Sequence, residues 1–106
     1  MTELGEREGQ CYRLAGRYVM DNRDAVLVHT TLFSPTLGHR MSHAFVEITP
    51  DMVWEPVTDQ VFLKGTLFPK YEVEEDARYT ADEMSRLLVT NNHWGPWEKE
   101  GDNEGS

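Results

Sequence analysis

Residues 43–57 read HAFVEITPDMVWEPV and determine the fold that we expect. Two runs rich in β-branched and aromatic residues, 43–48 and 52–57, lie on either side of Thr49-Pro50-Asp51. Proline suits the second position of a type I turn, and two such runs around a short turn are typical of a β-hairpin. The stretch therefore predicts two paired antiparallel strands, the first of which begins at His43.

The register of this hairpin decides which side chains meet. If Ile48 pairs with Met52 across a three-residue loop, His43 lies opposite Val57, and Glu55 is its diagonal neighbour on the same face. Diagonal neighbours are about 7–8 Å apart at the backbone, which two long side chains can span. A two-residue loop would instead place His43 and Glu55 on opposite faces of the sheet.

The rest of the chain predicts helices before and after a small sheet. The apolar positions of a first helix follow the i, i+3, i+4, i+7, i+8 pattern at Cys11, Leu14, Ala15, Tyr18 and Val19. The run from Ala25 to Phe33 is apolar on both faces, which is typical of a buried central strand. His39 follows in a polar loop.

Three further elements are expected after the hairpin: a strand near Val61 to Leu63, a weaker strand around Tyr71 and Val73, and a helix near the C-terminus. Thr80 and Glu83 have the spacing of a capping box, and the helix behind them should end at Asn91-Asn92. The predicted fold class is α+β, with an N-terminal cysteine-bearing helix packed on a small, mostly antiparallel sheet.

Composition limits the architecture and the partners. A chain of 106 residues with 39% hydrophobic content suits a single domain, which we expect over residues 9–97. The charged segments 1–8 and 98–106 are expected to be flexible tails. The formal charge of −9 argues against a nucleic-acid partner, and no apolar run approaches the roughly 20 residues that span a membrane. One cysteine and no apparent signal peptide predict a cytoplasmic protein; its oligomeric state stays open.

Cys11 is a candidate nucleophile because it stands where the first helix begins. Free backbone N–H groups and the helix dipole stabilise a thiolate at such a position, and the same groups can donate to an oxyanion. The side chain of Gln10 is a further candidate donor for an oxyanion hole. The alternative is that Cys11 is simply a small buried hydrophobic residue.

His43 is the candidate base. A thiol nucleophile needs a neighbour that takes its proton and later protonates the leaving group, and imidazole suits both tasks. His29, His39 and His93 fit this role less well, because they lie in mid-strand, in a polar loop and beside Trp94. His39 and His43 are four residues apart without the glutamate of a zinc helix motif, so no metal or other cofactor is expected.

Glu55 is the candidate acid that orients the imidazole. Glu55 is chosen because the hairpin register places it beside His43. Without such a partner, a glutamate is more often a solvated surface residue. Glu47 shares the face of His43 and is the reserve acid, and Asp59 is a more remote one.

The order of these motifs resembles the transglutaminase-like branch of the papain-like cysteine hydrolase superfamily. CYRLAG at 11–16, HAFVE at 43–47 and WEP at 54–56 stand where that branch shows a helix-opening cysteine, His-Ala-Trp-Val-Glu and a closing Asp-Pro. The resemblance implies that Cys11 is the nucleophile, His43 the base and Glu55 the orienting acid. Glutamate replaces the usual aspartate, and Phe45 replaces tryptophan.

A wider likeness to short bacterial or phage proteins extends as far as Trp97. The tryptophans Trp54, Trp94 and Trp97 are candidates for a cleft wall, although such aromatic residues more often close a small core. The expected function is thiol-dependent cleavage or transfer of an amide or isopeptide bond of a protein or peptide. The alternative is a non-catalytic, acidic protein-binding module on the same scaffold, possible for a phage-encoded protein and marked by an exposed apolar patch around Trp94 and Trp97.

Overall fold

The computed structural model describes residues 10–97, so both predicted tails lie outside the described residues. Three helices and five strands follow one another in this part of the chain: α2 (Cys11–Asp21), β1 (Val26–Ser34), β2 (His39–Thr49), β3 (Met52–Glu55), β4 (Gln60–Leu63), α3 (Lys64–Lys70), β5 (Glu74–Tyr79) and α4 (Ala81–Asn91). None of these helices is long and apolar enough to cross a membrane.

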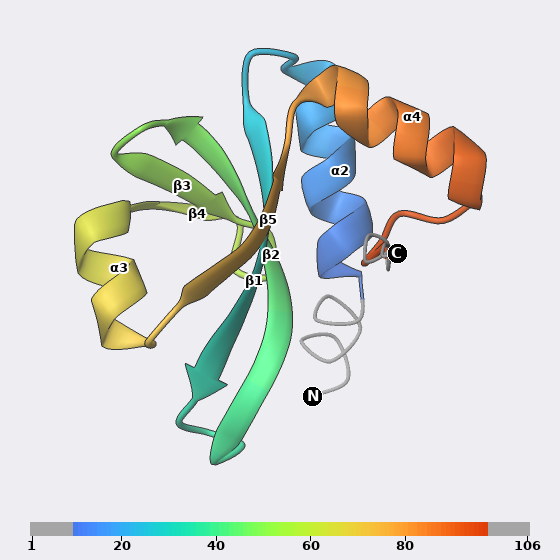
Figure 1. Ribbon diagram of the computed structural model, residues 1–106. Helices are drawn as coiled ribbons and strands as arrows, with labels where there is room; N and C mark the ends of the chain where they lie inside the picture. Colours follow the sequence, from blue (N-terminus) through green and yellow to red (C-terminus); the bar gives the residue numbers. More distant parts are fainter. Residues whose placement is uncertain (1–9, 98–106) are drawn as a thin grey trace.

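The strands form one antiparallel sheet in the order β4-β3-β2-β1-β5. Helices α2 and α4 cover one face of the sheet, and α3 lies against the other (Figure 1). The fold is therefore α+β, as predicted, with the cysteine-bearing helix packed on the sheet.

Each face of the sheet has its own apolar core. The α2 face buries Cys11, Ala15 and Val19 of the helix against strand residues that include Ala44 and Val46. The α3 face has a smaller cluster of Phe45, Val53 and Leu67, with further half-buried side chains around it. Because neighbouring residues of a strand point to opposite faces, β2 contributes to both clusters in alternation.

Strand β2 is longer than the sequence predicts. It begins at His39, so His39 lies in a strand and not in a loop, and His43 is inside β2. The pairing of β2 with β1 runs from Val26↔Glu47 to Ser34↔His39, which extends the strand into a long two-stranded arm. Residues 39–42, of which all but Met41 are polar, pair through their backbones, a property that side-chain polarity does not reveal.

The hairpin between β2 and β3 has the predicted register, but its loop is shorter than predicted and a bulge makes up the difference. Thr49 pairs with Met52, so the loop contains two residues, and a bulge at Ile48 then shifts the register. Beyond the bulge, Val46 pairs with Trp54. Because a bulge adds one residue to one strand, it cancels the effect of the shorter loop. His43 and Glu55 consequently keep the same face.

The segment between β4 and α4 differs most from the prediction. Helix α3 was not predicted, and the expected strand around Tyr71 and Val73 begins only at Glu74, after both residues. Helix α3 has seven residues, contains Pro69 and has no side-chain cap at its start, so it lacks the usual local signals of a helix. Packing of Leu67 in the smaller core stabilises it. By contrast, the predicted capping box of Thr80 and Glu83 is present at the start of α4.

Candidate active site

Cys11 is the first residue of α2 and belongs to the core beneath that helix. Only 2% of its surface is exposed. Gly16, one turn and a half further along, allows α2 to approach the C-terminal segment closely: a Cβ atom at Gly16 would lie 2.6 Å from the ring of Trp94. The helix that carries the thiol is therefore held between the sheet and the end of the described chain.

His43 reaches this thiol from the other face of the sheet. Its neighbour on the same face is Phe45, whose ring packs edge-on against the imidazole at a centroid distance of 4.9 Å. Pairs between β2 and β3 occur only at Val46, Glu47 and Thr49 in the described structure, so the edge of β2 is open on that side at His43. Cys11 interacts with the imidazole there and is among the causes that raise the pKa of His43.

Glu55 holds the opposite side of the imidazole. Its Oε2 lies 2.6 Å from Nε2 of His43, and both side chains are almost fully buried. Since Nε2 faces the carboxylate, Nδ1 is the ring nitrogen left for the sulfur. The sequence prediction that the hairpin brings His43 and Glu55 into contact is confirmed, although they are joined beyond the last β2–β3 pair.

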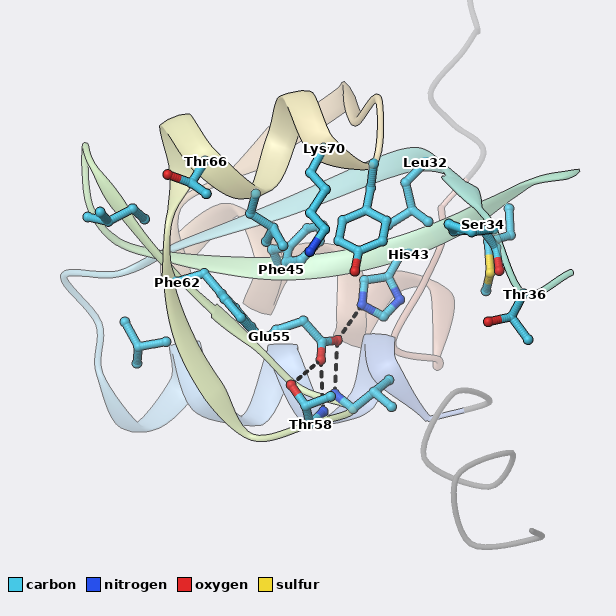
Figure 2. Close-up of a pocket in the computed structure, with 17 residues that line it drawn as sticks. Leu32, Ser34, Thr36, His43, Phe45, Glu55, Thr58, Phe62, Thr66 and Lys70 are labelled. Atoms are coloured by element: carbon cyan, nitrogen blue, oxygen red, sulfur yellow. Dashed lines mark hydrogen bonds and ion pairs between the residues drawn. The ribbon is translucent and has the colours of Figure 1, made fainter. Parts of the chain in front are cut away.

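The turn after β3 fixes the carboxylate of Glu55. The backbone N–H of Val57 donates to Oε2 at 3.0 Å, and the backbone N–H and the hydroxyl of Thr58 donate to Oε1 at 2.8 and 2.7 Å. Figure 2 shows His43 and Thr58 on either side of the carboxylate. The role of Thr58 was not predicted, but its place three residues after an acid in a turn is a signal for such side-chain-to-backbone bonding.

These contacts shift the pKa values of His43 and Glu55. Burial alone lowers the pKa of His43, but hydrogen bonds to Cys11 and Glu55 and their negative charges outweigh it and raise the pKa to about 9. For Glu55, burial acts in the other direction and raises the pKa, but hydrogen bonds from His43 and Thr58 outweigh burial and lower the pKa to about 2. At neutral pH the pair is therefore an imidazolium and a carboxylate.

A pocket of about 590 Å³ lies next to this pair on the α3 face. Its wall includes His43 and Glu55, but Cys11 is not among the lining residues. The pocket thus gives access to the imidazole and the carboxylate, and the sulfur lies behind them on the α2 side.

The other candidate polar residues have different partners. Glu47 binds Lys64 and Arg78, each at 2.9 Å, so it does not orient His43. Asp59 accepts a hydrogen bond from the Trp54 indole at 2.8 Å. The side-chain oxygen of Gln10, at the start of α2, accepts from the Arg13 guanidinium.

The tryptophans do not form a wall of this pocket. Trp54 stacks on Tyr18 of α2, and Trp97 is buried in the core on the same face. Trp94 is half-buried against Gly16. None of the three tryptophans lines the pocket beside His43, and Trp97 is buried.

A second buried histidine, His29, lies among aromatic rings on the α2 face. It contacts Tyr12, Tyr79 and Trp97, and within the described residues its Nε2 has no hydrogen-bond partner. Burial lowers the pKa of His29 to about 4, against a weaker opposite effect of Asp76. Over residues 10–97, no group of three His, Cys, Asp or Glu side chains is placed to hold a metal ion.

Comparison with known proteins adds no family assignment. No family model, no curated protein and no solved structure matches the chain.

Proposed function

We propose that the protein is a thiol-dependent hydrolase or acyltransferase that forms an acyl-enzyme at Cys11, in a small papain-like or transglutaminase-like domain. The observation that carries the proposal is the hydrogen bond of the His43 imidazole to the Glu55 carboxylate, together with the Cys11 thiol, which is among the causes that raise the pKa of the same imidazole. A nucleophile, a base within hydrogen-bond reach and a third group that orients the base are the parts that such chemistry requires.

The reaction follows from the positions of these groups. The thiolate of Cys11 attacks the carbonyl carbon of an amide or isopeptide bond, and a tetrahedral intermediate forms. The C–N bond then breaks, and the proton on Nδ1 of His43 passes to the leaving amine, which leaves a thioester. Water or an acceptor amine gives a proton back to His43 as it attacks the thioester, and the sulfur departs as thiolate.

Glu55 acts on this reaction through His43. A carboxylate on Nε2 keeps that nitrogen protonated and favours the imidazolium, which attracts the thiolate form of the neighbouring sulfur. The contacts of Glu55 with Val57 and Thr58 restrict the carboxylate, so the orientation of the ring is set before a substrate binds.

Access to the sulfur is the structural requirement of this proposal. Because 2% of Cys11 is exposed, an acyl donor reaches the sulfur only when the side chains over it move. A protein or peptide segment is the proposed substrate, since the net charge of −9 repels nucleic acid. A working free thiol also fits a reducing compartment, and we place the protein in the cytoplasm on that ground.

Alkylation of Cys11 by iodoacetamide at pH 6 tests the proposal. The wild-type protein should react faster than a His43→Ala variant, because the variant lacks the imidazole that takes the proton of the thiol. His39→Ala is the matched control, since His39 lies on the same strand, is exposed and bonds only the carbonyl of Arg40 within the described residues.

Intact mass measurement with an activated ester then tests the acyl-enzyme itself. A single acyl adduct should form on the wild-type protein and be lost in Cys11→Ser. Equally slow alkylation of wild-type and His43→Ala protein, with no adduct, would reject the enzyme.

That rejection would favour the second candidate function, a non-catalytic protein-binding module. The burial of Cys11 and its absence from the pocket wall are the observations on its side. In that case the three residues would only stabilise the fold, and Cys11→Ser would leave binding of the partner protein intact.

A further inference from the structure

We propose that the pocket on the α3 face binds a small molecule that has an apolar body and a carboxylate, and that Lys70 receives the carboxylate. Such binding goes beyond the proposed function and does not require Cys11 to act as a nucleophile. The pocket is bounded by β2, β4, α3 and the ends of β1 and β3.

The size and lining of the pocket fit a small apolar ligand. Its volume of about 590 Å³ lies within the range of small-molecule sites, roughly 300–1,000 Å³. Most of the wall is apolar and comes from several elements, with side chains such as Leu32, Phe45, Phe62, Leu67 and Tyr71. Side chains from elements this far apart in the sequence enclose a concave site that no single element could form.

The charge of the pocket favours an anion. His43, Glu55 and Lys70 are its charged side chains, and the first two form an ion pair with each other. Lys70 has no ion-pair partner in the range 10–97, and its Nζ lies 5.5 Å from the centroid of the Tyr71 ring. The net charge of the wall is therefore positive, although the whole chain carries −9.

The position of Lys70 directs this charge into the site. Figure 2 shows its side chain extending from α3 toward the side of the pocket where His43 and Glu55 lie. The contact with Tyr71 favours an ammonium held over the pocket, since a cation is attracted to an aromatic face. Thr66 is four residues before Lys70 and also lines the pocket, so the two side chains share one face of the helix.

A matched series of ligands tests the proposal by NMR titration of the whole chain. Octanoate, octanol and octylamine have the same apolar chain and differ in the charge of the head group. Octanoate should bind about three- to fivefold more tightly than octanol, which is the range for an ion pair at an exposed rim, and octylamine should bind most weakly. The amide shifts should concentrate around Phe45, Phe62 and Tyr71.

Three variants distinguish the contribution of the Lys70 charge to ligand binding from the contribution of the pocket itself. Lys70→Gln should remove the preference for octanoate over octanol and leave the binding of octanol unchanged. Arg17→Gln removes a positive charge from an exposed site on α2 and should keep the preference. Thr66→Trp should fill the pocket and abolish the binding of all three ligands, while its amide spectrum reports whether the fold is retained.

Each other outcome overturns the proposal: equal binding of octanoate and octanol, tighter binding of octylamine, no binding at all, or shifts confined to the α2 face. Failure of the enzyme proposal is distinguishable, because a protein that does not react at Cys11 but binds octanoate as described rejects only the enzyme.

Discussion

The two faces of the sheet each bury a histidine, and the two histidines behave in opposite ways. His43 and His29 are both about 95% buried, at 6% and 5% exposure. The pKa of His43 rises to about 9 because Cys11 and Glu55 outweigh the burial that lowers it, whereas burial among aromatic rings lowers the pKa of His29 to about 4. Burial without a charged partner thus disfavours the imidazolium of His29, whereas Cys11 and Glu55 together reverse the effect of burial at His43.

The comparison also separates a chemical role from a structural one. Ring packing explains the environment of His29, since its contacts are Tyr12, Tyr79 and Trp97. His43 has a partner on each side and a pocket beside it. Perturbed titration with a specific charge partner next to a cavity is the combination that marks candidate functional sites.

The largest expected effect comes from removing the acidic partner of His43, Glu55. In Glu55→Gln, the pKa of His43 should fall from about 9, because the hydrogen bond and the charge of Glu55 are lost while only Cys11 is left to oppose the effect of burial. The variant should lose about 3 kcal/mol of unfolding free energy at pH 6, since breaking a buried pair leaves one partner without compensation. Histidine ring signals followed by NMR, together with urea unfolding, measure the two quantities.

Glu47→Gln is the matched control for this change. Glu47 is also a buried glutamate on the face of His43, but its partners are Lys64 and Arg78. The pKa of His43 should stay near 9 in this variant. A His43 titration that is insensitive to Glu55→Gln would refute the assignment of the acid.

The next effect is the pH dependence of stability. His29 changes the stability on the acid side of the profile, and His43 changes it on the alkaline side. The folded pKa of His29, about 4, is below its unfolded value of about 6.5, so the unfolded state binds the proton more readily and stability falls from pH 6.5 toward 4. The stability due to His43 is fully present below about pH 6.5 and is lost as pH rises toward 9.

His29→Leu should flatten the acid side of this profile by about 2–3 kcal/mol and leave the alkaline side unchanged. Glu55 does not confuse the test above pH 4.5, because its folded pKa is about 2 and its contribution is lost only as pH falls from 4.5 toward that value. Urea unfolding at half-unit steps between pH 4.5 and 9 measures both slopes. An acid limb that is equally steep in His29→Leu would show that another group controls it.

Sequence prediction succeeded for local features of the chain and failed for features that depend on contacts between distant elements. The positions of Cys11 on a helix and of His43 and Glu55 on one hairpin face were predictable, because periodicity and register are local properties. The bulge at Ile48 and the helix α3 were not, since the former is a compensation between two strands and the latter depends on tertiary packing. The pocket was missed with α3, because Lys70 lies on that helix.

A pair of glycine substitutions tests how tightly the cysteine-bearing helix is held on the His29 face. In Gly16→Ala, the new Cβ would lie 2.6 Å from the Trp94 ring, so the ring must move, at a cost of about 1–2 kcal/mol. In the control Gly65→Ala, on α3, the space around the Cβ is open, and alanine should stabilise the helix by up to about 1 kcal/mol. Thermal unfolding should show shifts of opposite sign, and a stabilised Gly16→Ala would contradict the packing of Trp94 on α2.

The smallest expected effect sharpens the account of how Glu55 is held. Thr58→Val removes the hydroxyl that donates to Oε1 at 2.7 Å but keeps the backbone N–H that donates at 2.8 Å. Because Thr58 is exposed and the carboxylate keeps its bonds to His43 and to two backbone groups, the loss should be about 0.5–1 kcal/mol. The pKa of Glu55 should rise slightly, since one donor to its charged form is gone, and that of His43 should stay well above 6.5. A collapse of the His43 titration in Thr58→Val would mean that the hydroxyl, and not the backbone of the turn, positions the acid.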